Sequence, residues 1–264
     1  MGTVPAQPER NDAARAARAD RLASLTTLAR GVSHELNNVL MPLVAYPELV
    51  TAELEEGSQA YQDVMEMKRS ADAAAEIVRD LMAFARRTGY DLRPLDINER
   101  IRAVESSAAY QALKEAHASV QVRLEPGDGL WTVSGDPAYL DRALLALLRH
   151  GCEALRDAGG TLTLSTENLS LEQPLDGYEV VPAKDFVVVT MRDSGPALAS
   201  EELDRIFEPY YWKRHGRSGA GLGLALVHGV VKDHGGFVDT ESGGERGTVI
   251  RLYFPSVGGT SKEA

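Results

Sequence analysis

The chain has 264 residues, of which 44% are hydrophobic and 25% are charged, so it has the composition of an ordinary globular protein with room for two modest domains. Acidic side chains outnumber basic ones by 39 to 28, and the net charge of -11 argues against nucleic acid or an anionic membrane as the main partner. The single cysteine, Cys152, excludes an intrachain disulfide, and we expect a cytoplasmic location. No apolar run reaches about 18 residues, the length of a membrane span, so we expect no membrane segment in this chain.

The first predicted element is a pair of helices. Residues 1–12 are polar and contain two prolines, and we expect them to be a disordered end. Residues 13–88 then space their apolar side chains in alternating steps of three and four, which is typical of a coiled coil or a helical bundle. The first such run is Leu22, Leu25, Ala29, Val32, Leu36, Val39, Leu43, Tyr46 and Val50, and the second is Tyr61, Val64, Lys68, Ala71, Ala75, Val78, Met82 and Ala85.

The two runs are predicted to form an antiparallel hairpin, because the short polar segment 55–58, which contains Gly57, is typical of a turn. A lone hairpin would leave one apolar face uncovered. Pairing with a second copy would bury that face in a four-helix bundle, and we therefore expect a homodimer.

The pattern changes after the hairpin. Residues 89–98 contain Gly89 and Pro94 and interrupt the helical spacing, which predicts an interdomain linker. In residues 99–257, strand-like and helix-like segments alternate, which predicts an α/β sandwich, and residues 258–264 are expected to be a disordered tail. The expected strands are 119–124, 161–166, 186–191, 237–240 and 248–254, and the expected helices lie near 101–117, 137–158 and 222–234. The chain as a whole is predicted to be of the α+β class.

A candidate reactive histidine lies in the first helix. His34 falls two residues after Val32 and two before Leu36, so it is expected to point away from the bundle core. Glu35 is adjacent to it, and Asn38 shares its face one helical turn further on. A nucleophilic histidine needs one unprotonated ring nitrogen, which a neighbouring carboxylate can secure, and an amide can position a water molecule for hydrolysis. An inert surface histidine is the alternative that spacing alone leaves open.

Residues 31–38, Gly-Val-Ser-His-Glu-Leu-Asn-Asn, resemble the H box of histidine kinases in its H-E-x-x-N form. The resemblance implies that His34 takes the γ-phosphoryl group of ATP and that Glu35 acts as the base. It also implies that Asn38 assists a phosphatase activity.

A candidate nucleotide site lies between residues 193 and 248. Asp193 and Gly195 directly follow a predicted strand, which places a carboxylate where glycine lets a ligand approach the backbone closely. A carboxylate can accept a hydrogen bond from the exocyclic amine of adenine. The glycines of segment 219–223 open a predicted helix beside basic side chains, an arrangement that can hold phosphate groups. For that segment taken alone, a flexible glycine loop is the alternative.

The ordered set of motifs in this region is more specific than any single motif. Asp193-x-Gly195, Phe207-Glu-Pro, Gly219-x-Gly-Leu-Gly and Gly247-Thr248 resemble, in this order, the G1, F, G2 and G3 boxes of the histidine kinase ATP-binding domain, a member of the GHKL group. The resemblance implies that the domain binds ATP together with Mg²⁺. The residues expected to bind the nucleotide are Asp193, Gly195, Lys213, Arg214, Arg217, Gly219, Gly221, Leu222, Gly223 and Thr248.

One motif departs from the family pattern. The N box should place two asparagines four residues apart on the helix near residues 144–154, facing Mg²⁺ and the phosphates, but Ala146 and His150 occupy those positions. Mg²⁺ prefers oxygen ligands in an octahedral arrangement, and an imidazole nitrogen is a poorer ligand for it. His150 is the candidate metal ligand, and we expect the coupling of nucleotide binding to Mg²⁺ to be weak.

The sequence thus predicts the core of a two-component sensor histidine kinase, which would autophosphorylate His34 from ATP and pass the phosphoryl group to an aspartate of a response-regulator receiver domain. A degenerate kinase that acts as a phosphotransferase, a receiver phosphatase or a scaffold is the alternative that Ala146 and His150 favour. An ATPase of the chaperone or mismatch-repair kind is a second alternative, against which the phosphoacceptor hairpin argues.

Overall fold

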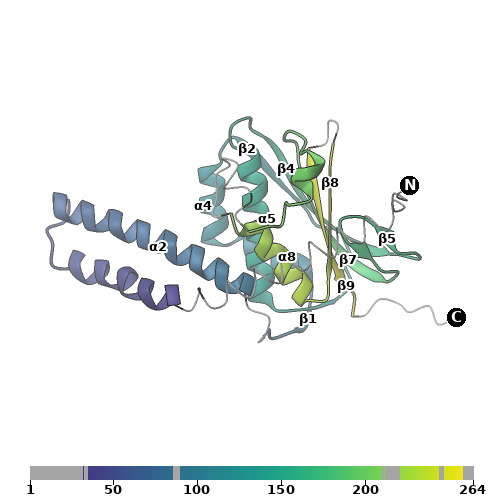
Figure 1. The fold of residues 1–264 in the computed structure, drawn as a ribbon, viewed down its shortest axis with the longest axis horizontal. Helices are drawn as coiled ribbons and strands as arrows, with labels where there is room; N and C mark the ends of the chain where they lie inside the picture. The colour runs from purple at the N-terminus through teal and green to yellow at the C-terminus, as the bar shows by residue number, and fades with distance from the viewer. Residues whose placement is uncertain are drawn as a thin grey trace, which may run out of the picture. The chain divides into compact units, whose positions relative to one another are not determined.

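The computed structural model describes residues 32, 35–85, 90–209, 211, 221–243 and 247–257. These residues fall into two compact units, a helical one within Arg18–Arg86 and an α/β one within Arg87–Ala264. Figure 1 shows the helical pair of the first unit and the sheet with its helices in the second.

The helical unit is an antiparallel hairpin, as the spacing predicts. Residues 35–51 are helical, and α2 spans Gln59–Ala85. The turn between them is confirmed at Gly57, whose φ of 86° lies in the left-handed region, and at Ser58, whose Oγ accepts a hydrogen bond from the Tyr61 N–H at 3.1 Å and so caps α2. Figure 1 shows the two helices running side by side in opposite directions.

The apolar seam predicted for the first helix is largely exposed in the single chain. Six of its side chains keep between 40% and 64% of their surface accessible: Val32, Leu36, Val39, Leu43, Tyr46 and Val50. In α2, by contrast, Ala71 and Val78 are buried, and Lys68, the polar residue in the second seam, forms an ion pair with Glu48, with Nζ and Oε1 2.9 Å apart. The hairpin therefore presents a continuous apolar face along its first helix.

The α/β unit is built on one mixed sheet. Within the described residues this sheet has five strands in the order β2-β4-β7-β9-β8, and only β2 and β4 run parallel to each other. The strands are β2 Val120–Glu125, β4 Gly160–Ser170, β7 Asp185–Asp193, β9 Thr248–Pro255 and β8 Phe237–Ser242. Two small sheets pair β1 Arg93–Leu95 with β3 Val133–Gly135, and β5 Leu175–Asp176 with β6 Val180–Val181.

Helices cover one face of the main sheet, as Figure 1 shows. The described helices of this unit are α3 Ile97–Glu105, α4 Ala108–Ala116, α5 Pro137–Ala154, α6 Ser200–Leu203 and α8 Gly223–Asp233. α5 packs on β4 and β7, and α8 packs on β8, β9 and α5. On α5, the helical spacing of Leu140, Leu144, Leu147 and Leu148 turns these side chains into the core, where each is at most 2% exposed. Burying a leucine stabilises the fold by about 1.5–3 kcal/mol, so this layer contributes much of the stability. Helices packed on one face of a sheet confirm the predicted α/β sandwich.

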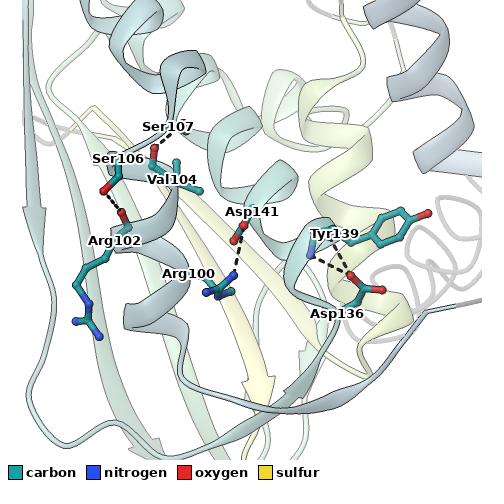
Figure 2. A network of polar contacts seen from close by, with 9 residues as sticks. Arg100, Arg102, Val104, Ser106, Ser107, Asp136, Tyr139 and Asp141 are labelled. Atoms are coloured by element: carbon teal, nitrogen blue, oxygen red, sulfur yellow. Dashed lines mark hydrogen bonds and ion pairs between the residues drawn. The ribbon is translucent and has the colours of Figure 1, made fainter.

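The helix expected near 101–117 is two helices. α3 ends at Glu105 and α4 begins at Ala108. Ser106 donates its hydroxyl proton to the Arg102 carbonyl at 2.9 Å, while the Ser107 Oγ accepts a hydrogen bond from the Tyr110 N–H at 3.2 Å. Figure 2 shows the two serines side by side at this break. Serine side chains compete with the helical backbone for hydrogen bonds, and the second serine caps the new helix.

The predicted start of α5 is confirmed in detail. The Oδ1 of Asp136 accepts hydrogen bonds from the N–H groups of Ala138 and Tyr139 at 3.0 and 3.4 Å, and Pro137 occupies the first helical position. Figure 2 shows this cap. The cap fixes where α5 begins, and thereby which of its side chains face the candidate nucleotide site at its other end.

The segment predicted as a linker, 89–98, is structured from its second residue onward. β1 and the first residues of α3 lie in it, and the Tyr90 hydroxyl donates a hydrogen bond to Oδ2 of Asp233, at the end of α8, at 2.8 Å. The Tyr90 ring packs edge-on against Tyr139, with 4.5 Å between centroids. The Asp91 N–H donates to Oδ2 of Asp136 at 3.0 Å. These contacts anchor the entry of the chain into the α/β unit, and a three-residue strand has no periodicity that the sequence could have revealed.

Removing the Tyr90 hydroxyl should weaken this anchor measurably. We expect Tyr90→Phe to lower the free energy of unfolding of the α/β unit by about 1 kcal/mol, because a half-buried hydrogen bond to a carboxylate is lost while the ring contacts remain. Urea denaturation followed by circular dichroism measures this loss. Asp233→Asn keeps an acceptor oxygen and should cost less; a Tyr90→Phe protein as stable as its parent would contradict the assigned role of the hydroxyl.

Two further features of the fold are the character of its helices and the place of its single cysteine. Among the described residues, no helix combines the length and the apolar character needed to cross a membrane. Cys152 lies in α5 with 0% of its surface exposed, and burial raises the pKa of its thiol to about 11. The thiol is thus a small buried side chain of the core.

Candidate functional site

The candidate site is built at the end of β7, where the strand places Asp193. This side chain is 2% exposed, and its Oδ1 accepts hydrogen bonds from the N–H of Gly195 at 2.8 Å and of Thr248 at 3.3 Å. Thr248 comes from β9, which pairs with β7, so the sheet brings the three residues together from two neighbouring strands. Because both bonds go to one oxygen, they fix the orientation of the whole carboxylate.

Two glycines make this arrangement possible. A side chain on Gly247 would place its Cβ 2.2 Å from the Asp193 carbonyl oxygen, and the φ of 62° at this residue also favours glycine. A Cβ on Gly195 would lie 2.9 Å from Oδ1 of Asp193. Glycine at 195 and 247 therefore lets the backbone approach the carboxylate closely enough to hold it.

Asp193 lies in the wall of a cavity of about 320 Å³. The end of α5 and the turn after it form one side, and the segment after β7 forms another. The lining residues are His150, Glu153, Ala154, Arg156, Asp157, Ala158, Asp193, Pro196, Leu198 and Thr248. The cavity is thus part apolar and part charged, which suits a ligand with a flat ring and charged groups.

The glycine segment at the start of α8 lies against α5 at Ala146, four residues before the cavity residue His150. Gly221 has a φ of 73°, Leu222 is fully buried, and α8 begins at Gly223. A Cβ on Gly223 would lie 3.7 Å from the backbone oxygen of Ala146, so the N-terminus of α8 lies against the middle of α5. A helix N-terminus carries partial positive charge and unpaired N–H groups, which favour a phosphate group nearby.

Comparison with known proteins agrees with this geometry. Residues 135–258 match the family model described as histidine kinase-, DNA gyrase B-, and HSP90-like ATPase. The chain is 28% identical over 240 residues to sensor kinase CckA of Brucella abortus, covering 90% of this chain and 25% of the relative. It is 30% identical over 251 residues to sensor histidine kinase ZraS of Klebsiella oxytoca, covering 94% of this chain and 49% of the relative. This chain contains a histidine kinase catalytic core.

The solved structures agree at the level of the fold. Full-length ShkA in complex with AMPPNP superimposes with a TM-score of 0.65 over 87% of this chain and 46% of that chain, at 23% identity. Histidine kinase AdeS of Acinetobacter baumannii gives a TM-score of 0.53 at 16% identity, covering 80% of this chain and 96% of that chain. The kinase core described here spans a quarter to about half of the length of the curated relatives named above.

The N box of this kinase core has no asparagine. Ala146, at the first position, has no metal-ligating atom in its side chain and lies against the start of α8, whereas His150, at the second, lines the cavity. Within the described part of the chain, no group of three or more His, Cys, Asp or Glu side chains could hold a metal ion by itself. A cation in this cavity would need the ligand's own oxygen atoms to complete its coordination.

Glu153 is a cavity residue that was not predicted from the sequence. It is half-buried in the cavity wall, and burial raises the pKa of its carboxyl to about 7, against the opposing effect of Arg149 and Arg156. A signal was present, since Glu153 follows His150 by three residues on the same helix, where both can face one ligand. The N-box motif specifies only two positions four residues apart, and position 153 is not one of them.

The remaining predicted site residues divide between described and undescribed parts of the chain. Glu35 and Asn38 are exposed on the first helix, so both side chains are open to solution. The predictions for His34, Lys213, Arg214, Arg217 and Gly219 lie outside the described residues.

The F box residue Phe207 is part of the packing beside the site. It is fully buried, and its ring lies edge-on to Tyr178 of the β5–β6 hairpin, with 5.1 Å between centroids, and tilted against His228 of α8 at 5.5 Å. The F box therefore ties the segment after β7 to both α8 and the β5–β6 hairpin.

Proposed function

We propose that this chain is the ATP-dependent core of a sensor histidine kinase, which phosphorylates His34 and passes the phosphoryl group to an aspartate of a response regulator. The observation that carries the proposal is the Asp193 carboxylate, held in the cavity wall by the N–H groups of Gly195 and Thr248. The match of residues 135–258 to the ATPase family and the named sensor kinase relatives support it.

In this proposal the nucleotide binds through two ends of the site. Asp193 accepts a hydrogen bond from the adenine amine, and the apolar wall at Leu198 contacts the ring. The N-terminus of α8, with Gly221 and Gly223, holds the phosphates. Lys213, Arg214, Arg217 and the backbone of Gly219 and Leu222 are proposed to complete the phosphate contacts. Positioning and charge stabilisation supply most of the catalysis in phosphoryl transfer.

A divalent cation supplies charge neutralisation between the phosphates in this chemistry when it is bound. The residues present fit Mg²⁺ only in part, because Ala146 offers no ligand and His150 offers a nitrogen. We therefore expect nucleotide binding that Mg²⁺ assists weakly.

The phosphoacceptor part of the proposal rests on the hairpin. Glu35 is proposed to remove the proton from the His34 ring, and Asn38 to position water for dephosphorylation of the receiver. The exposed apolar seam of the first helix supports a homodimer in which two hairpins form a four-helix bundle, because six large apolar side chains would otherwise stay in water.

A second candidate function is a degenerate kinase, which would serve as a phosphotransferase, a receiver phosphatase or a scaffold. Ala146 and His150 favour it, since the cation has lost both usual amide ligands. Incubating the chain with γ-labelled ATP and a divalent cation tests the proposal. Slow labelling of His34 supports the kinase, whereas a chain that binds no nucleotide supports the role of a scaffold.

Restoring the N box should separate these two candidates further. We expect His150→Asn combined with Ala146→Asn to raise both the Mg²⁺ enhancement of ATP binding and the rate of autophosphorylation, by roughly tenfold or more, because amide oxygens replace a nitrogen and a methyl group. Calorimetry with and without Mg²⁺ and a labelling time course measure the two effects. Ala158→Asn, which adds an amide elsewhere in the cavity wall, is the matched control. A parent that already shows strong Mg²⁺ coupling and fast labelling would contradict the expectation.

A further inference from the structure

The turn between β5 and β6, residues 177–179, contacts three other parts of the α/β unit. The Tyr178 N–H donates a hydrogen bond to Oδ1 of Asp239 in β8 at 2.9 Å, and the Tyr178 ring lies edge-on to Phe207. The next residue, Glu179, reaches α8. A hairpin of two strands of two residues each is too short to be stable by itself, so these contacts hold the turn in place.

The Glu179 carboxylate joins α8 to β8. Its Oε1 lies 3.2 Å from Nε2 of His228, and its Oε2 accepts hydrogen bonds from Lys232 Nζ at 3.0 Å and from the Val238 N–H at 3.1 Å. Burial by itself would raise the pKa of this carboxyl, but the hydrogen bond with His228, the charges of His228 and Lys232 and the Val238 N–H together lower it. Glu179 is therefore ionised at neutral pH, with polar partners on both oxygens.

These bonds restrain α8 along its axis. His228 and Lys232 are one helical turn apart on the same face, and each is held by a different oxygen of one carboxylate. The apolar contacts of α8 with α5 are non-directional and tolerate a small slide, whereas hydrogen bonds depend on direction. Gly223, the first residue of the same helix, lies five residues before His228. The position of the N-terminus of α8 is therefore linked to Glu179.

The same carboxylate also acts on the F box. The His228 ring, which Glu179 holds at Nε2, lies against Phe207 with 5.5 Å between centroids. Tyr178, the neighbour of Glu179, contacts Phe207 from its own side at 5.1 Å. Phe207 is fully buried between these rings, so displacing the turn would disturb its packing.

We propose that Glu179 is a positioning residue for the phosphate end of the site, which holds the start of α8 and Phe207 in the arrangement that the nucleotide needs. The inference rests on the proposed binding of ATP. Helix N–H groups must lie within hydrogen-bond reach of phosphate oxygens, so a shift of about 1 Å is enough to weaken binding. The adenine end at Asp193 is held by Gly195 and Thr248 instead, and it should be unaffected.

The experiment compares ADP with adenosine, which carries the same base and ribose without phosphates. Displacement of a fluorescent ADP analogue measures both affinities, including a weak one. Glu179→Ala should weaken ADP binding by about tenfold and leave the adenosine affinity within about twofold of the parent's. Glu179→Gln keeps an acceptor oxygen without the charge, so its loss should be smaller. The glutamine variant also serves as the test if the alanine variant fails a circular dichroism check.

Two controls separate positioning from stability. Asn168→Ala removes hydrogen bonds to the backbone of Gly129 and Trp131 and not to α8, so it should lower stability but keep the ratio of ADP to adenosine affinity. Lys232→Met removes one partner of the carboxylate and should weaken ADP binding less than Glu179→Ala. Adding it to Glu179→Ala should cost little more, because the two residues act together. Fully additive losses would overturn their joint role.

The outcomes separate this inference from the proposed function. Parental ADP affinity in a folded Glu179→Ala protein overturns the positioning role, as does an equal loss of ADP and adenosine affinity. No ADP binding by the parent overturns the proposed function itself, and the inference with it.

Discussion

Replacing His34 with glutamine is expected to abolish acid-labile labelling of the chain by γ-labelled ATP. Glutamine keeps a similar length and polarity but has no nucleophilic ring nitrogen, so the phosphoramidate bond cannot form. Because position 34 is expected to point away from the apolar seam, the variant should remain dimeric. The measurement is the acid-labile label per chain, alongside light scattering for the oligomeric state.

Asn38→Ala is the matched control on the same helix. Its exposed side chain lies one turn after position 34, so the variant should still be labelled but should slow the loss of phosphate from a receiver domain. Label that persists at the parental level in His34→Gln would show that another residue accepts the phosphate. Unchanged receiver dephosphorylation in Asn38→Ala would count against the role of the amide.

Asp193→Asn is expected to weaken ADP binding by about 10- to 100-fold, the range that corresponds to losing a hydrogen bond to a charged group. The reason lies in the contacts of the carboxylate. If the amide oxygen of asparagine takes the N–H groups of Gly195 and Thr248, its NH₂ group faces the adenine amine, and two donors oppose each other. If the amide turns round, its NH₂ group faces the two backbone N–H groups instead.

Isothermal titration calorimetry with ADP measures this change, and circular dichroism verifies that the variant is folded. Asp128→Asn, the same substitution at an exposed position of the α/β unit, is the control and should bind as the parent does. A folded Asp193→Asn protein with parental affinity would mean that the adenine is recognised elsewhere.

Long elements were predictable from the sequence because their periodicity reports burial. The five strands of the main sheet and helices α5 and α8 were all expected close to where they lie, and α5 begins at residue 137, where its start was expected. Short elements were not. β1 and β3 are stabilised by each other, and the break between α3 and α4 depends on which hydrogen bonds Ser106 and Ser107 make, which composition does not reveal.

The residues of the site also divide into those that the sequence predicts and those that it does not. Asp193, Gly195 and Thr248 could be found from ordered motifs, because close backbone approach requires glycine at fixed places, and the structure brings the three together. Glu153 could not be found so readily. Its importance comes from being half-buried in a cavity wall with a raised pKa, and burial depends on packing between segments distant in sequence.

The contacts of Tyr90 also set the length of the connection between α2 and the α/β unit. Only residues 86–89 join Ala85, the last residue of α2, to Tyr90, and a chain of that length spans at most about 18 Å even when fully extended. If the contacts of Tyr90 and Asp91 opened, Arg93 in β1 would be the next fixed residue, and the tether would lengthen to about 29 Å. The contacts of Tyr90 and Asp91 thus help to set how many residues of the chain connect the two units.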